Sequence, residues 1–331
     1  MMIRRLVRDG LARDRLSSCH RLLSTRSDGE YLALLEAKLP VLYEEALHQF
    51  APAWLATANV VGAASLSPPS HVLDLASGAS AEPAITLAQR FTGATVVASD
   101  NNPSILQLAA SRVDELGLNE RVELAAIDLA NLVELGRAGG DTAGEDDQIA
   151  DVVTCSLGLF MLPPAHQEPC LRGIHALLRP GGLMVATVWD RMALTEVGGR
   201  CMAKVLGKAE PPAMPYDSTC LGHGRADVML RAAGYTLLDE AVAGGQPHHN
   251  QQHTLQVHLG AADAEEAWML GLLPFQGALA DLQQRGEADV YSRAREAFRE
   301  EAARAGWVDA ASGELVVTGL DYRVLAARKP L

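Results

Sequence analysis

The residues best suited to chemistry lie where an apolar segment meets a loop of small residues. Residues 71–75 (HVLDL) predict a short buried strand that carries one carboxylate, Asp74. The loop that follows, 76–80 (ASGAS), leads into a helix predicted over 84–91. Pro83 is tolerated in the first turn of that helix because its missing N–H would have no partner there. A ligand can therefore approach the backbone between this strand and this helix.

A second carboxylate indicates which ligand this would be. Asp100 ends the next apolar run, 95–99, about 20 residues after Gly78, where a carboxylate can accept hydrogen bonds from ribose hydroxyls. The pattern therefore predicts a nucleoside site. A dinucleotide would need a G-x-G-x-x-G loop for its pyrophosphate, and only Gly78 is present, which disfavours a nicotinamide-dependent oxidoreductase. Asp74 would also repel phosphate and attract a cationic amino group.

The segment around Asp74 resembles motif I of the class I S-adenosylmethionine-dependent methyltransferases, an acidic residue followed by G-x-G-x-G. The resemblance extends over about 71–190, and its most specific part is the segment 178–182 (LRPGG) before a predicted fifth strand. It implies an α/β fold with a Rossmann-like sheet, parallel with one antiparallel strand. The sequence departs from the family pattern at Ala76 and Ser80, where the family usually has glycines.

The resemblance also implies a cofactor and the residues that hold it. In the family, three acidic residues serve the methionine amino group, the ribose and the adenine of S-adenosylmethionine, and these roles would pass to Asp74, Asp100 and Asp128. With their neighbours, the residues expected to bind the cofactor are Asp74, Ala76, Ser77, Gly78, Asp100, Asn101, Asp128, Leu129 and Ser156. The implied enzyme transfers a methyl group from S-adenosylmethionine to a small-molecule acceptor. The motifs are also similar to those of the quinone and menaquinone C-methyltransferases.

A competing hypothesis comes from a different class of protein. Ala76 and Ser80 narrow the space beside the loop, as expected for a non-catalytic Rossmann-type binding or assembly module with a degenerate cofactor site. Binding of S-adenosylmethionine separates the two hypotheses.

The rest of the chain is expected to build walls around this site. We divide it into a basic leader over 1–26, a helical cap over 27–66 and a methyltransferase domain over 67–331, with 243–312 as a helical insertion that forms a lid. Residues 190–217 are predicted to form a second segment that faces the substrate. The aromatic residues expected to contact the substrate are Tyr31, Trp54, Phe160 and Trp189.

Histidines gather at the start of the predicted insertion, at 248, 249, 253 and 258. Their spacing does not give the i, i+4 pair of a metal-binding helix, and nearby glycines predict a loop, so no metal site is expected. We take His253 as a candidate general base, because an unperturbed pKa of about 6.5 suits proton removal near neutral pH.

Charge and composition limit the partners and the compartment. The net charge of −13 argues against nucleic acid, because phosphate binding requires a basic surface. The five cysteines form no C-x-x-C pair, which indicates free thiols in a reducing compartment. No apolar run approaches the length of a membrane-spanning helix. Residues 1–26 carry seven arginines and several serines, which predicts a mitochondrial or other organelle transit peptide; without one, the protein would be cytoplasmic.

A chain that begins at Ser27 is expected to bind S-adenosylmethionine as tightly as the full chain. The reason is that no cofactor motif begins before His71, and the basic leader differs in charge from the rest of the sequence. Calorimetric titration of both forms measures this. A truncated protein that stays folded but loses binding would contradict the prediction.

Overall fold

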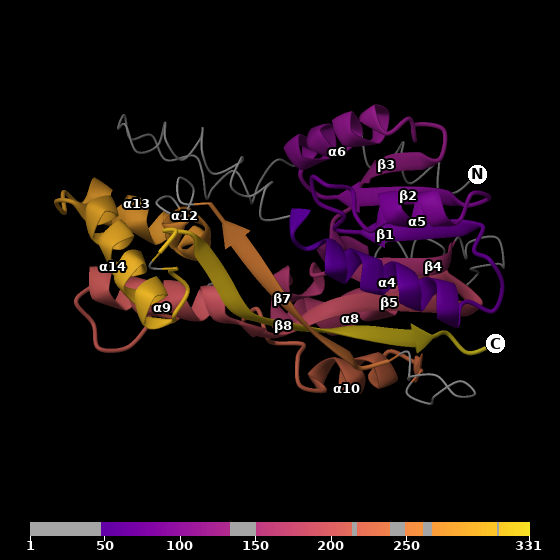
Figure 1. Cartoon of the computed structure of the whole chain (residues 1–331). Helices are drawn as coiled ribbons and strands as arrows, with labels where there is room; N and C mark the ends of the chain where they lie inside the picture. The colour runs from indigo at the N-terminus through magenta and orange to yellow at the C-terminus, as the bar shows by residue number, and fades with distance from the viewer. Residues whose placement is uncertain (1–47, 133–149, 214–216, 239–248, 261–266, 310) are drawn as a thin grey trace.

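The described part of the molecule is an α/β sheet with a separate group of helices beyond one of its edges (Figure 1). The structure is a computed structural model that describes residues 48–132, 150–213, 217–238, 249–260, 267–309 and 311–331. Tyr31 and His248, and the sequence predictions made for residues 1–47 and 239–248, lie outside these ranges. None of the described helices is long and apolar enough to span a membrane.

Eight strands form the sheet in the described residues. They are β1 (His71–Leu75), β2 (Thr95–Asp100), β3 (Val122–Ala126), β4 (Ala150–Ser156), β5 (Leu178–Met192), β6 (Thr236–Leu237), β7 (Gln251–Leu259) and β8 (Leu315–Arg328). Their order is β3-β2-β1-β4-β5-β8-β6, and β7 also pairs with β8. The pairs among β1 to β5 are parallel, whereas β8 runs antiparallel to β5, β6 and β7. The predicted Rossmann-like sheet, parallel with one antiparallel strand, is confirmed.

Helices alternate with the strands along the chain. They are α4 (Ala51–Ala64), α5 (Ala84–Arg90), α6 (Pro103–Glu115), α8 (Pro164–Leu177), α9 (Ala193–Val205), α10 (Arg225–Ala232), α12 (Trp268–Gly271), α13 (Gln276–Gln284) and α14 (Val290–Arg304), with 3₁₀ turns η1 (Leu129–Asn131), η3 (Leu159–Met161) and η4 (Leu273–Phe275). The sequence at the start of α6 favours a helix N-terminus. Pro103 stands in the first turn, and the Asn102 side chain caps the helix by accepting a hydrogen bond from Ser104 N at 2.9 Å.

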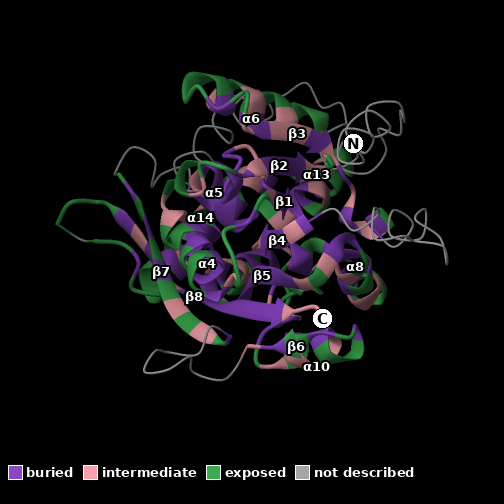
Figure 2. Cartoon of the chain, turned by 90° about the vertical axis from the view of Figure 1, so that its right-hand side faces the viewer, coloured by how far each residue is buried: buried purple, intermediate pink, exposed green. Residues whose placement is uncertain are grey.

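Two apolar cores lie on opposite faces of the sheet. The first joins the sheet to α4, α5 and α6 and continues into the helical group, and the second joins the sheet to α8 and α10. The central strands are buried almost throughout (Figure 2). Val96, Val97 and Ala98 of β2 are apolar and buried although they point to alternate faces, because a strand covered on both faces needs no polar side.

The helical group consists of α9, α12, α13 and α14 and lies beyond the edge of the sheet at which β5 ends (Figure 1). Glu301 on α14 is almost completely buried and forms ion pairs with Lys204 and Arg200 of α9, at 2.9 and 2.8 Å. A Cβ on Gly198 of α9 would clash with the Gly271 carbonyl oxygen of α12, and a Cβ on Gly271 would clash with the Phe298 ring of α14. The group is therefore tightly packed on itself.

Several expected elements differ in the structure. The segment 243–312, predicted to be a helical insertion, also contains strand β7, so the prediction of a loop around His253 and His258 is wrong. The apolar residues Leu255, Val257 and Leu259 of β7 alternate with exposed polar ones, as in a half-buried strand. Much of 190–217, predicted to be a segment facing the substrate, is the packed helix α9. The last strand, β8, begins at Leu315, ahead of the predicted start at Leu320.

Candidate functional site

The strand order reverses between β1 and β4. β2 and β3 lie on one side of β1, whereas β5 and β8 lie beyond β4. The chain therefore continues from β1 and from β4 to helices on opposite faces of the sheet, α5 and α8. In open α/β sheets ligands bind in the crevice at this point. The residues predicted from the sequence to bind a cofactor stand at the ends of β1, β2, β3 and β4, along this one edge.

The loop after β1 has the backbone of a glycine-rich loop although it contains one glycine. Ala76, Gly78 and Ala81 have φ angles of 54°, 65° and 50°. For alanine this left-handed conformation costs roughly 1–2 kcal/mol. Ala76 thus takes the conformation that glycine takes easily, and the later left-handed position is Ala81, not Ser80. Ser77 ties the loop to β2, because its N–H donates to Ser99 O at 2.8 Å and its Oγ accepts from Ser99 N at 3.0 Å.

Asp74, which is predicted to bind the methionine amino group of the cofactor, is enclosed by protein. Its side chain is fully buried. Thr154 Oγ1 donates to Asp74 Oδ1 at 2.6 Å, and Ala84 N at the start of α5 donates to Oδ2 at 3.3 Å. Burial raises the pKa of Asp74 from 3.8 to about 7, against the lowering effect of these hydrogen bonds. Asp74 therefore joins β1, β4 and α5 beneath the loop, and both of its oxygens are engaged by the protein.

Asp100 and Gly78 face each other across the ends of β2 and β1. Asn102 N donates to Asp100 Oδ1 at 3.0 Å. Burial raises the pKa of Asp100, and the backbone N–H groups of Asn102, Gly78 and Asn101 oppose that rise. A Cβ placed on Gly78 would meet none of the described atoms within 4 Å. The loop therefore offers open space beside a half-buried carboxylate, and this arrangement fits a ribose.

The ends of β3 and of the next turn supply the remaining cofactor residues. Asp128 caps η1, since its Oδ1 accepts from Ala130 N at 2.9 Å, and its side chain is half-buried. Leu129 is buried beside it, and Asn101 at the end of β2 is exposed. Asp128 and Asp100 thus follow neighbouring strands, β3 and β2, whose register pairs Asp100 with Ala126.

Ser156 at the end of β4 has a partner that the sequence did not reveal. Its Oγ lies 3.0 Å from Thr57 Oγ1 on α4. The next residue, Leu157, has a φ of 56°, and its N–H donates to Thr187 Oγ1 at 3.0 Å. The residue after Leu157 is Gly158. A larger residue would not fit there, because its Cβ would lie 2.7 Å from the Ala76 side chain. The loops after β1 and β4 therefore touch, and α4 covers their junction. No local pattern around Thr57 distinguishes it from other helical residues.

The aromatic residues predicted to contact the substrate are buried. Trp54, Phe160 and Trp189 are 8%, 8% and 2% exposed. Trp189 packs edge-on against Phe50 and Tyr322, with ring centroids 6.0 and 6.3 Å apart. In this structure they act as packing residues at the carboxyl end of the sheet, and a role in substrate contact stays a prediction.

His253 lies away from the end of β4. The strand register pairs it with Tyr322 and pairs Tyr322 with Trp189, so it is three strands from β4, or roughly 14 Å at the usual strand spacing. Its ring stacks on Tyr322 with centroids 5.0 Å apart, and burial lowers its pKa. Among the described residues its buried Nε2 has no hydrogen-bond partner, and no group of three metal-ligating side chains is found there.

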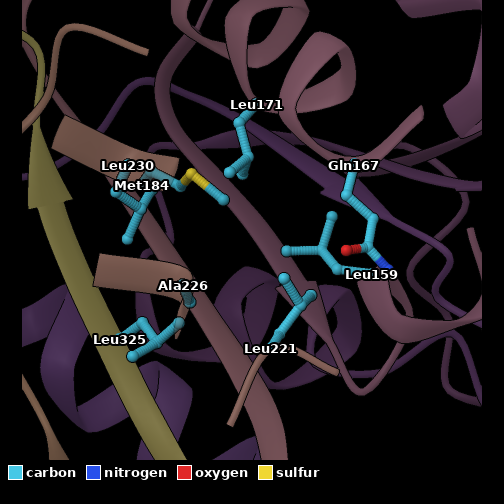
Figure 3. A pocket seen from close by; sticks show the side chains of 8 residues that line it. All are labelled: Leu159, Gln167, Leu171, Met184, Leu221, Ala226, Leu230 and Leu325. Atoms are coloured by element: carbon cyan, nitrogen blue, oxygen red, sulfur yellow. The ribbon is translucent and has the colours of Figure 1, made fainter. Parts of the chain in front are cut away.

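A small apolar cavity lies on the face of the sheet that α8 and α10 cover (Figure 3). Its volume is about 10 Å³, room for about one water. It is lined by Leu159, Gln167, Leu171, Met184, Leu221, Ala226, Leu230 and Leu325. The cavity is too small for a substrate, so we do not assign it to the site.

Comparison with known proteins covers the same part of the chain. Residues 72–182 match the family model described as "Methyltransferase domain". Carboxy-S-adenosyl-L-methionine synthase of Geobacter metallireducens is 30% identical over 142 residues, which cover 42% of this chain and 52% of that protein. The chain thus matches about half the length of this curated relative. The segment that matches the family model, 72–182, contains every predicted cofactor residue.

Solved structures resemble the chain more distantly. The YcgJ protein of Bacillus subtilis aligns with a TM-score of 0.47 at 13% identity and covers 83% of this chain and 98% of its own. A second structure is phosphoethanolamine N-methyltransferase 2 of Haemonchus contortus in complex with phosphomonomethylethanolamine and S-adenosylhomocysteine. It aligns with a TM-score of 0.41 at 12% identity, and the alignment covers 80% of this chain and 50% of that one.

Proposed function

We propose that this protein binds S-adenosylmethionine at the carboxyl edge of β1 to β4 and transfers its methyl group to a small-molecule acceptor. The observation that carries the proposal is the pairing of Asp100 with the open backbone at Gly78, within a segment that matches a methyltransferase domain. Asp100 would bind the ribose hydroxyls, Asp128 the adenine, and the loop 76–80 the methionine part. The proposal assigns Asp74 the task of holding this loop.

The chemistry asked of the protein is mainly alignment. When bound, the cofactor supplies a methyl group already activated by a positively charged sulfur. The residues of this chain would hold donor and acceptor in line and exclude water, which the buried apolar side chains after β4, such as Leu159 and Phe160, support. Transfer to a thioether or a neutral amine needs no general base. Transfer to an alcohol or an activated carbon needs one, and His253 is the candidate for that role.

The acceptor is proposed to be small and not a nucleic acid. The net charge of −13 disfavours a polyanion, and the segment after β4 lacks the Asn-Pro-Pro-Tyr or Asp-Pro-Pro-Tyr sequence associated with amino methylation of nucleic acids and proteins. A quinone-like acceptor methylated on carbon is the finer form of this proposal. Transfer of labelled methyl groups to a panel of quinones, phenols, amines and thioethers would identify the acceptor.

Calorimetric titration with S-adenosylmethionine is expected to show binding with one site per chain. NADH is expected to give no fluorescence change, because the loop lacks the glycines that a pyrophosphate requires. Absence of heat with S-adenosylmethionine would favour the non-catalytic module instead, and tight binding of NADH would favour an oxidoreductase.

A further inference from the structure

A relay of hydroxyl groups joins α4 to the end of β4. Thr57 Oγ1 lies 3.0 Å from the carbonyl oxygen of Ala53, one turn earlier in α4, and 3.0 Å from Ser156 Oγ. Thr57 is fully buried, and Ser156 is half-buried. A threonine hydroxyl has one hydrogen to donate, and a carbonyl can only accept. The Thr57 hydrogen therefore goes to Ala53, and the Ser156 hydroxyl must donate to Thr57.

This direction decides what Ser156 can offer a ligand. Its only hydrogen is used, so the oxygen presents lone pairs and acts as a hydrogen-bond acceptor. Ser156 stands two residues after Thr154 in β4, and alternate residues of a strand share a face. Thr154 bonds to Asp74 beneath the β1 loop, so Ser156 lies on the face toward that loop. An acceptor oxygen there suits an ammonium group or a methyl group on positive sulfur and disfavours carboxylate or phosphate.

We propose that Thr57 is a positioning residue, which fixes the Ser156 hydroxyl as a hydrogen-bond acceptor for the cationic methionine end of the cofactor. This inference rests on the proposed function. It adds a residue of α4, outside the segment that matches the methyltransferase domain, to the cofactor site.

The test measures the affinity for S-adenosylmethionine by calorimetry in a double-mutant cycle. Thr57→Val keeps the shape of the side chain and removes the hydroxyl with both of its hydrogen bonds, so binding is expected to weaken by about threefold to tenfold, the effect of one hydrogen bond. Thr57→Ser keeps the relay and is expected to bind like the parent. In a Ser156→Ala background, Thr57→Val is expected to cause no further loss, because Thr57 acts through Ser156.

Each outcome decides the matter. Unchanged affinity in Thr57→Val, or an equal loss with and without Ser156, overturns the inference. If Thr57→Val does not fold, the Ser156→Ala variant tests the relay from its half-buried end. An affinity of Ser156→Ala for S-adenosylmethionine equal to that of the parent also overturns the inference. Titration with S-adenosylhomocysteine locates the contact: a loss for both ligands places it at the ammonium, and a loss for S-adenosylmethionine alone places it at the sulfonium. A parent protein that binds neither ligand overturns the proposed function, and the inference with it.

Discussion

The Asp74→Asn variant is expected to lose most of the pH dependence that Asp74 gives to the stability of this protein. The carboxyl is fully buried, and its pKa is raised from 3.8 to about 7. Between these pH values the folded protein keeps a proton that the unfolded chain releases, so rising pH favours unfolding. The stability that Asp74 contributes is fully present below pH 3.8, and it is lost as the pH rises from there through about 7.

The expected size is large. The difference between a pKa of 3.8 and one of about 7 corresponds to roughly 4 kcal/mol. Asparagine cannot ionise, so the unfolding free energy of Asp74→Asn should rise relative to that of the parent as the pH increases from 4.5 to 8. Urea unfolding at several pH values in this range, followed by circular dichroism, measures the difference.

Asp151→Asn provides a control of the opposite sign. Asp151 accepts hydrogen bonds from Ser70 N and His71 N at 2.8 and 2.9 Å and pairs with Arg179, and its pKa is lowered below 3.8 despite partial burial. Its contribution is lost only as the pH falls through that lowered pKa. The difference between Asp151→Asn and the parent should therefore be constant from pH 4.5 to 8. A similarly flat difference for Asp74→Asn would show that Asp74 is ionised in the folded protein.

The Asp100→Ala variant is expected to bind S-adenosylmethionine about tenfold to a hundredfold more weakly than the parent, because bonds to a charged group contribute roughly 1.5–3 kcal/mol. The carboxylate would accept hydrogen bonds from both ribose hydroxyls. Asp100 is half-buried at a strand end, so the fold should survive the change. Calorimetry gives the affinity, and thermal unfolding checks the fold.

Asp128→Asn is the matched comparison, with a smaller expected loss. Asparagine keeps an oxygen that can accept from Ala130 N, as Asp128 does, and only the contact with adenine is altered. If Asp100→Ala binds as tightly as the parent with an unchanged melting temperature, the cofactor site is assigned to the wrong residues.

The amino-acid sequence alone determined the sheet and the line of residues along its edge. Apolar runs that end in Asp100 or lead into the small-residue loop at Gly78 are local patterns, and parallel strands bring their carboxyl ends to one edge. The order of helices and strands followed from the same local periodicity. The histidine segment could also have been recognised, because Leu255, Val257 and Leu259 alternate with polar residues. The neighbouring glycines and proline predict a loop instead, and the structure contradicts that prediction.

Only the tertiary structure decided what Asp74, Thr57 and His253 do. Asp74 is enclosed because Thr154, 80 residues further along, donates to it. Thr57 meets Ser156 across 99 residues. His253 lies beside Tyr322 because β7 pairs with a strand near the end of the chain. Burial and hydrogen-bond direction depend on which distant segments pack together. The local sequence around a carboxyl therefore does not determine its pKa.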